Sequence, residues 1–277
     1  MPQARSEWMR IALGLEYDGS GYRGWQSQVH APGVQAAVES ALSVVADHPV
    51  EVTAAGRTDA GVHASMQVVH FDTTAVRTER NWALGANTNL PPAVSVLWVR
   101  EVPETFHARF SAFTRSYRYC ILNRIPRPAL AANRVCWVRE PLDHEIMHRA
   151  AQQLVGEHDF TSFRAAECQA RTPVRQLYTI EVERREQMVV MSVTANAFLQ
   201  HMVRNIAGTL ISVGLGERPL PWVKEVLAAR DRKRGGVTSA PQGLYLAGVE
   251  YPQELNLPSE APMDGWTVVA YIPPSRG

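Results

Sequence analysis

The spacing of apolar residues changes several times along the chain, from a period of two to a period of about 3.6. In residues 9–17 every second side chain from Ile11 onward is apolar, which predicts a half-buried strand. After Gly33, an acceptable N-cap, apolar residues from Val34 to Val45 recur at helical spacing and predict a helix. This change of period limits the fold to one in which strands and helices share a core.

The same reasoning gives the first half of the chain the order strand, helix, strand, strand, helix, strand. The further strands are expected at 50–53, 67–71 and 93–100, and the second helix at 78–86. The segment AGRTDAGVHA, residues 55–64, falls in the loop between two of these strands.

A similar order recurs in the second half. The expected elements are a strand near 113–122, a helix opening at Asp143, strands near 177–183 and 189–195, a helix from about 199 to 213, a helix after Pro219 and Pro221 that runs through Ala229, and a strand at 244–250. The short connection at 184–187 favours antiparallel pairing.

We therefore predict the α+β class, with two similar halves that are each a mainly antiparallel β-sheet with helices packed on one face. The expected domains are 1–105 and 106–251, with a cleft between them. A proline-rich tail at 252–277 is expected to run over the surface.

The composition places the chain among folded proteins, with 45% hydrophobic and 20% charged residues. Its uncharged stretches are interrupted by polar residues, so no membrane span is expected, and the first ten residues lack a secretory signal. Cys120, Cys136 and Cys168 are an odd number with no close spacing, which predicts reduced thiols and neither a disulfide framework nor a metal site. These features predict a cytoplasmic protein.

The net charge of +1, from 28 Lys and Arg against 27 Asp and Glu, excludes a protein that coats nucleic acid through its overall charge. Any site for a polyanion must be a local patch. The basic residues are almost all Arg, with Lys only at 224 and 233, and the planar Arg side chain suits phosphates and base edges. Genomic base composition explains the Arg excess equally well.

His144 to His148 reads HEIMH and matches HExxH, in which two histidines one helical turn apart bind zinc. The longer metzincin pattern fails at Ala151 and Leu154, where glycine and histidine are needed. The alternative is a helix whose Ile146, Met147, Ala150 and Leu154 form a core stripe, with the histidines at its flank.

Residues 19–24 read GSGYRG and match GxGxxG after a predicted strand. The helix whose N-terminus binds the pyrophosphate is missing, because residues 25–32 precede the next helical pattern. A flexible loop fits better. If this loop has a function, Tyr22, Arg23 and Trp25 offer stacking and cationic groups to nucleic acid.

Asp59 lies between Gly56 and Gly61 in the loop that joins two predicted strands. Aspartate in such a glycine-rich turn commonly only forms the turn. Rigid flanking strands also hold a reactive carboxylate well. The residues alone leave both roles open.

The Asp59 loop resembles the signature of the TruA-type family of tRNA pseudouridine synthases, and the resemblance covers nearly the whole chain in order. The matching segments are YDGS at 17–20, GWQ at 24–26, AGRTDAGVHA at 55–64, NLP at 89–91, FHARF at 106–110, YRY at 117–119, DFTSF at 159–163, NAF at 196–198, HMVRN at 201–205 and GLYL at 243–246.

The resemblance implies an isomerase that converts uridine to pseudouridine at positions 38 to 40 of the tRNA anticodon stem-loop, with no cofactor and no metal. It implies that Asp59 is the catalytic nucleophile or base and that Arg204 is its partner. Tyr117 is expected to stack on the uracil and to assist proton transfer, and Leu244 to line the base pocket. The active site is then expected in the cleft between the halves.

The resemblance also implies a homodimer that binds tRNA. Arg57 is expected to contact RNA where the flipped base leaves the stem. Further expected RNA contacts are Arg23, Arg109, Arg115, Arg118 and Arg164. Ser116 departs from the family, which often has a basic residue before the stacking tyrosine. A zinc peptidase and a non-catalytic RNA-binding module are the rival hypotheses.

Overall fold

The computed structural model describes residues 8–26 and 33–258, so most of the predicted proline-rich tail lies outside the described residues. The chain forms two compact units. The first runs up to Phe113 and includes a return segment that starts at Leu246, and the second runs from Thr114 to Tyr245. We describe each unit by itself.

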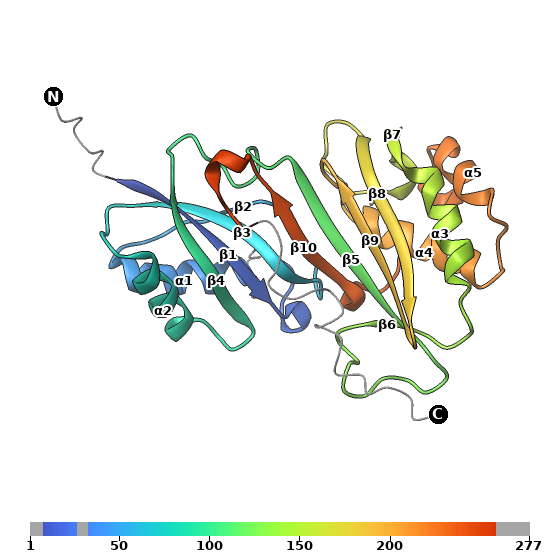
Figure 1. The fold of residues 1–277 in the computed structure, drawn as a ribbon, viewed down its shortest axis with the longest axis horizontal. Coiled ribbons are helices and arrows are strands. Elements are labelled where there is room, and N and C mark those ends of the chain that lie inside the picture. Colours follow the sequence, from blue (N-terminus) through green and yellow to red (C-terminus); the bar gives the residue numbers. More distant parts are fainter. Residues whose placement is uncertain (1–7, 27–32, 259–277) are drawn as a thin grey trace. The chain divides into compact units, whose positions relative to one another are not determined.

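The first unit is an antiparallel sheet with two helices (Figure 1). Its elements are β1 (Met9–Tyr17), α1 (Val34–Ala46), β2 (Thr53–Ala54), β3 (His63–Thr73), α2 (Glu79–Asn89) and β4 (Val94–Val102). Strand β1 pairs with β3 and β4, and β2 pairs with β3. This order confirms the predicted sequence of strands and helices.

Local sequence explains where the helices of the first unit begin. Gly33 is the N-cap of α1, as predicted, and the Thr78 side chain caps α2 by accepting from the Asn81 amide. Helix α2 packs on β4 and α1, and its fully buried Trp82 meets Phe71 of β3 with ring centroids 5.1 Å apart.

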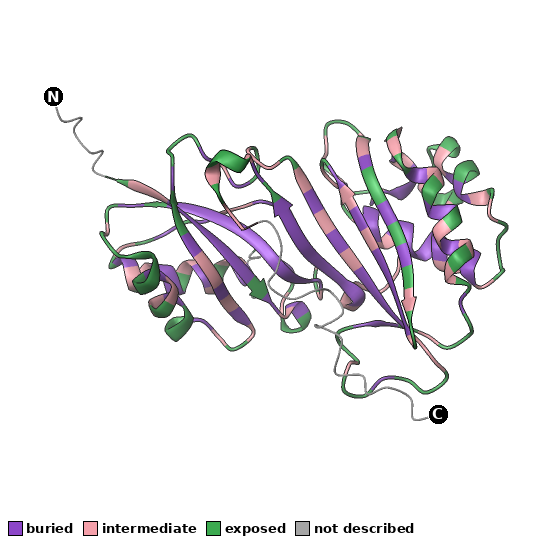
Figure 2. Ribbon diagram, in the orientation of Figure 1, coloured by how far each residue is buried: buried purple, intermediate pink, exposed green. Residues whose placement is uncertain are grey.

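Strand β1 is not half-buried, because both of its faces are covered (Figure 2). Leu13 is fully buried, and Ala12 on the opposite face is fully buried as well. On that opposite face the Trp98 indole lies over Gly14, where an added Cβ would come within 2.0 Å of it. The alternation correctly predicts the strand, but small residues and one large neighbour bury its second face.

The second unit is also a mainly antiparallel sheet, in the order β5-β9-β8-β7. Its elements are β5 (Thr114–Asn123), β6 (Cys136–Val138), α3 (His144–Ala151), β7 (Gly156–Asp159), β8 (Val174–Arg185), β9 (Met188–Ala195), α4 (Met202–Gly214) and α5 (Trp222–Ala229). Strand β6 pairs with β5 in parallel. The α+β prediction is therefore confirmed.

Helices cover the sheet of the second unit. Helix α3 packs on β8 and α4, and α4 packs on β5. Strand β10 (Leu244–Glu250) has the predicted bounds and begins in this unit, whereas its residues from Leu246 belong to the first. Three-residue β6 and four-residue β7 went unpredicted because they are too short to show a period.

Helix α4 begins at Met202, three residues after the predicted start at Leu199. The delay has a local cause, because His201 takes a left-handed conformation with φ of 61° and so breaks the helical path. Among the described residues, none of the helices combines the length and apolar character needed to cross a membrane.

Candidate active site

The Asp59 loop joins β2 to β3 in the first unit. Its side chains alternate in exposure, with Arg57 exposed, Thr58 only 7% exposed and Asp59 half-buried. The Val62 amide donates to the Asp59 carbonyl at 3.1 Å, and Gly61 supports this turn with φ of +76°. The loop thus places a carboxylate and a guanidinium, two residues apart, within reach of solvent.

The segment at 18–25 lies directly against the Asp59 loop. The Trp25 amide donates to the Thr58 carbonyl at 3.0 Å, and the Gly61 amide donates to the Tyr22 carbonyl at 3.4 Å. The Gly19 amide donates to His63 Nδ1 at 3.1 Å. These bonds connect the two segments largely through backbone atoms.

Two glycines of the GxGxxG match make this close approach feasible. An added Cβ would lie 2.0 Å from the Val62 carbonyl oxygen at Gly19 and 2.6 Å from the Thr58 carbonyl oxygen at Gly24, where φ is +98°. At Gly21 nothing lies within 4 Å. Trp25 is 2% exposed, so the hypothesis that it stacks on nucleic acid is wrong.

Tyr117 lies in the second unit on β5, opposite Val193 of β9. It is 9% exposed, and its ring meets Phe198 edge to face with centroids 5.0 Å apart. Ser116, the residue that departs from the family pattern, shares a hydrogen bond of 2.8 Å with the hydroxyl of Thr194. Tyr117 is therefore held in place by aromatic packing.

Arg204 lies in the first turn of α4 and fixes the chain that leads to Leu244. Its Nε donates to the Ser239 carbonyl at 2.8 Å, and the Ser239 amide donates to the Arg204 carbonyl at 3.2 Å. The Tyr119 hydroxyl holds the next carbonyl, that of Ala240, at 2.7 Å. Leu244, 6% exposed, opens β10 shortly afterwards.

Tyr119 and two of the cysteines show how apolar the interior of this unit is. Burial raises the pKa of Tyr119 well above its usual value, and burial raises the pKa of Cys120 to about 12. Cys120, Cys136 and Cys168 are free, and the first two are buried. Burial raises the pKa of Cys136 as well, so the two buried thiols, Cys120 and Cys136, remain protonated at neutral pH.

The arginines expected to contact RNA differ in exposure. Arg23 and Arg109 are exposed, and the Arg109 guanidinium lies 5.6 Å from the centroid of the Phe110 ring. Arg118 and Arg164 are half-buried. Arg115 is 9% exposed and donates to the Asn196 carbonyl at 3.0 Å, so the fold itself uses this side chain.

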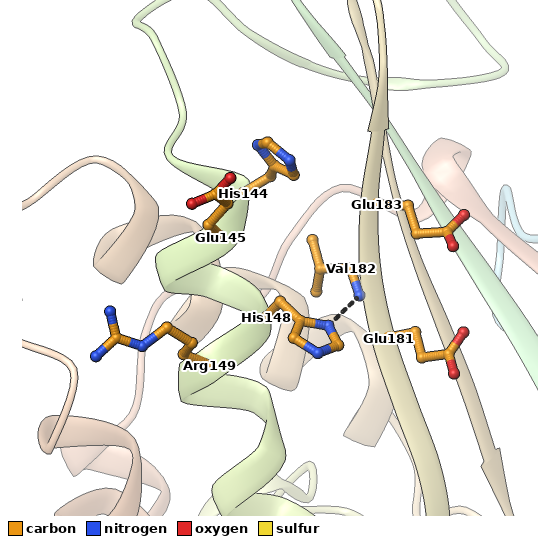
Figure 3. Close-up of a pocket in the computed structure, with 7 residues that line it drawn as sticks. All are labelled: His144, Glu145, His148, Arg149, Glu181, Val182 and Glu183. Carbon is orange, nitrogen blue, oxygen red and sulfur yellow. Dashed lines mark hydrogen bonds between the residues drawn. The ribbon is translucent and has the colours of Figure 1, made fainter.

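The HExxH residues line a pocket of about 320 Å³ on α3 and β8 (Figure 3). The Val182 amide donates to His148 Nδ1 at 3.2 Å, so a neutral His148 carries its proton on Nε2. Neither nitrogen then has a lone pair for a metal, and the zinc-peptidase hypothesis loses a ligand.

The core-stripe alternative explains the helix better, since Met147, Ala150 and Leu154 are each at most 1% exposed, although Ile146, the fourth expected member, is only half-buried. Residues 8–26 and 33–258, which the structure describes, contain no group of three His, Cys, Asp or Glu side chains that is placed to hold a metal ion.

Asp59 and Arg57 thus share one loop of the first unit, whereas Tyr117, Arg204 and Leu244 belong to the second. Sequence reasoning missed Tyr17 and Gln67, which lie beneath the Asp59 loop, and Thr58 within the loop, to which Tyr17 bonds. The AGRTDAGVHA string contains Thr58, but no periodicity marks it as buried.

A family model described as tRNA pseudouridine synthase matches residues 15–111 and 150–252. The chain therefore belongs to the tRNA pseudouridine synthase family, whose members are isomerases. It is 58% identical over 250 residues to tRNA pseudouridine synthase A of Nitrosococcus oceani, covering 90% of this chain and 96% of that protein.

Two further relatives have the same name. The one from Coxiella burnetii is 57% identical over 249 residues, which cover 90% of this chain and 95% of the relative. The one from Pseudomonas aeruginosa is 57% identical over 250 residues, which cover 90% and 88%. A solved H/ACA RNP bound to a substrate RNA containing 2'-deoxyuridine shares 11% identity at a TM-score of 0.36, over 86% of this chain and 47% of that one.

Proposed function

We propose that this chain isomerises uridine to pseudouridine at positions 38 to 40 of the tRNA anticodon stem-loop. The observation that carries the proposal is the Asp59 loop, which presents a carboxylate beside the exposed Arg57 in a chain of this family. The relatives are named tRNA pseudouridine synthase A, which supports tRNA as the substrate.

The reaction breaks the bond between ribose C1′ and uracil N1 and forms a bond between C1′ and C5. Asp59 acts as the nucleophile or as the base at the ribose, and C5 loses its hydrogen while N1 gains one. Atoms and electrons balance without an oxidant or a nucleotide. The proposed reaction therefore needs only side chains of the enzyme.

The other site residues assist the same uridine in this proposal. An arginine next to a carboxylate lowers its pKa by roughly 1 to 3 units, and Arg204 has this role for Asp59. Tyr117 stacks on the uracil, a contact worth about 1 to 3 kcal/mol, and assists proton transfer from C5. Leu244 lines the base pocket.

The stem-loop binds through arginines in this proposal. Flipping the uridine costs a few kcal/mol, and Arg57 stabilises the vacated stem. Arg23, Arg109, Arg115, Arg118 and Arg164 contact phosphates or grooves. The enzyme works as a homodimer in the cytoplasm, and neither a cofactor nor a metal takes part.

Release of tritium from uridine C5 tests the proposal. A tRNA labelled at C5 is mixed with excess enzyme, without added metal or nucleotide, and stem-loops substituted singly at 38, 39 and 40 locate the reactive uridine. We expect release with the wild type and none with Asp59→Asn. Tight tRNA binding without release would favour the RNA-binding module, and release by Asp59→Asn would contradict the role of Asp59.

A further inference from the structure

Two residues of the Asp59 loop are fastened to the sheet beneath it by buried polar side chains. The Gly56 carbonyl accepts from Gln67 Nε2 of β3 at 2.8 Å. The Thr58 hydroxyl lies 2.8 Å from the hydroxyl of Tyr17, on β1, in a buried hydrogen bond. Gln67 is fully buried and Tyr17 is 4% exposed, so both anchors come from the core of the first unit.

The anchored residues alternate with the residues of the proposed site. Thr58, whose hydroxyl is held from below, is only 7% exposed, whereas Arg57 is exposed and Asp59 is half-buried. The anchored threonine is thus turned into the core, and its two neighbours reach solvent. The Thr58 carbonyl also accepts from the Trp25 amide at 3.0 Å, so Thr58 is held through both its side chain and its backbone.

Core packing alone does not explain a tyrosine at position 17. A phenylalanine would fill nearly the same space without burying a hydroxyl, and a buried hydroxyl costs free energy unless it is hydrogen-bonded. Burial raises the pKa of Tyr17 to about 12, although hydrogen bonds with Thr58 and Gln67 lower it. The hydroxyl thus keeps its proton at neutral pH, and the contact with Thr58 stays a hydrogen bond between neutral groups.

We propose that Tyr17 is a positioning residue for the isomerisation, and that its hydroxyl, through Thr58, fixes the direction from which Asp59 approaches the uridine. This inference rests on the proposed function. Tyr17 does not touch the substrate in this account, and its effect on the rate passes through the Asp59 loop. A displacement of about 1 Å in a reacting group costs up to about 100-fold in rate.

The first test is Tyr17→Phe, which removes only the hydroxyl. We expect the single-turnover rate at saturating tRNA to fall about 10- to 100-fold, while the dissociation constant for tRNA stays within about twofold. The matched control is Tyr251→Phe. Tyr251 is also a buried tyrosine of the first unit, 9% exposed, but its hydroxyl donates to the Ala108 carbonyl at 2.7 Å, away from the Asp59 loop.

Position 58 gives a second test that does not depend on how Tyr17→Phe folds. Thr58→Ser keeps a hydroxyl and should retain at least about a third of the rate, whereas the isosteric Thr58→Val should lose as much as Tyr17→Phe. The double variant Tyr17→Phe/Thr58→Val should be no slower than the slower single variant, because both single variants remove the same hydrogen bond between residues 17 and 58.

Three results would overturn the inference: an unchanged rate in Tyr17→Phe, an equal loss in Tyr251→Phe, or equal rates in Thr58→Ser and Thr58→Val. An inactive wild type would instead refute the proposed function.

Discussion

In the first unit, the loop that carries Asp59 is anchored at Gly56 and Thr58 by side chains from β1 and β3, whereas in the second unit the Arg204 side chain itself bonds to the Ser239 carbonyl. Gln67 and Tyr17 anchor the residues on either side of Arg57, and Trp25 adds a backbone bond. The Arg204 Nε–H group donates a hydrogen bond to the Ser239 carbonyl.

The two units therefore differ in whether a proposed catalytic side chain also holds the fold together. A change at Asp59 alters the reacting carboxylate and leaves the loop's described anchors in place. A change at Arg204 removes a proposed catalytic partner and a structural bond together.

Asp59→Asn should abolish turnover, a loss of at least about 1,000-fold, with tRNA affinity within a few fold of the wild type. The free energy of unfolding should change by about 0.5 kcal/mol or less, because asparagine keeps the size of the side chain. Single-turnover assays and urea denaturation measure the two quantities. A strongly destabilised Asp59→Asn would break the contrast.

Arg204→Lys should lower both turnover and stability, because lysine keeps the charge but loses the Nε–H that donates to the Ser239 carbonyl. The free energy of unfolding should fall by about 1 kcal/mol or more. The exposed Arg139→Lys is the control and should stay within about 0.5 kcal/mol of the wild type. Loss of turnover at full stability would show that Arg204 gives no structural support.

Gly24→Ala should destabilise the first unit by about 1 to 3 kcal/mol and slow turnover. The added methyl group would meet the Thr58 carbonyl oxygen at 2.6 Å in a backbone with φ of +98°. Gly21→Ala is the matched control, because nothing lies within 4 Å of its Cβ position. Equal melting temperatures for the two variants would mean that the 18–25 segment shifts away from the Thr58 carbonyl at little cost in free energy. The segment would then not support Asp59.

The stability of the first unit should fall as the pH drops from about 6.5 toward 4, because His70 is buried as a neutral ring. Its Nδ1 accepts from the Ala108 amide at 3.1 Å, and burial, with the nearby Arg10, lowers its pKa from 6.5 to about 4.

The sign follows from that lowered value. The unfolded chain takes up the proton first, so the contribution of His70 is full above pH 6.5 and is lost as the pH falls through the folded pKa. The slope should be at most about 1.4 kcal/mol per pH unit. His70→Gln should flatten it in urea titrations at several pH values, and an unchanged slope would mean that other groups cause it.

Periodicity was enough to predict the long elements, because an element such as α1 repeats its helical spacing of buried residues, with Val34, Val38 and Leu42, over 13 residues. Motif spacing also located the Asp59 loop, since its residues are adjacent in sequence. The burial of both faces of β1 could not be predicted, because it depends on Trp98, which arrives from another strand.

The anchors of the Asp59 loop were missed for a similar reason. Tyr17 is 41 positions from Thr58, and only the pairing of β1 with β3 brings such distant residues together. The GxGxxG and HExxH matches have the spacing of ligand sites, but backbone groups of this chain occupy the places where a ligand would bind. Gly19 and Gly24 face the carbonyls of Val62 and Thr58, and His148 accepts from the Val182 amide.

His148 of α3 and Gln152, the residue that follows this helix, also affect how copies of this chain can associate. His148 accepts from the Val182 amide, and Gln152 Nε2 donates to the Ile180 carbonyl at 2.6 Å. These two backbone groups of β8 thus bond to side chains of this chain. The two bonds disfavour sheet extension and aggregation by strand addition at residues 180–182.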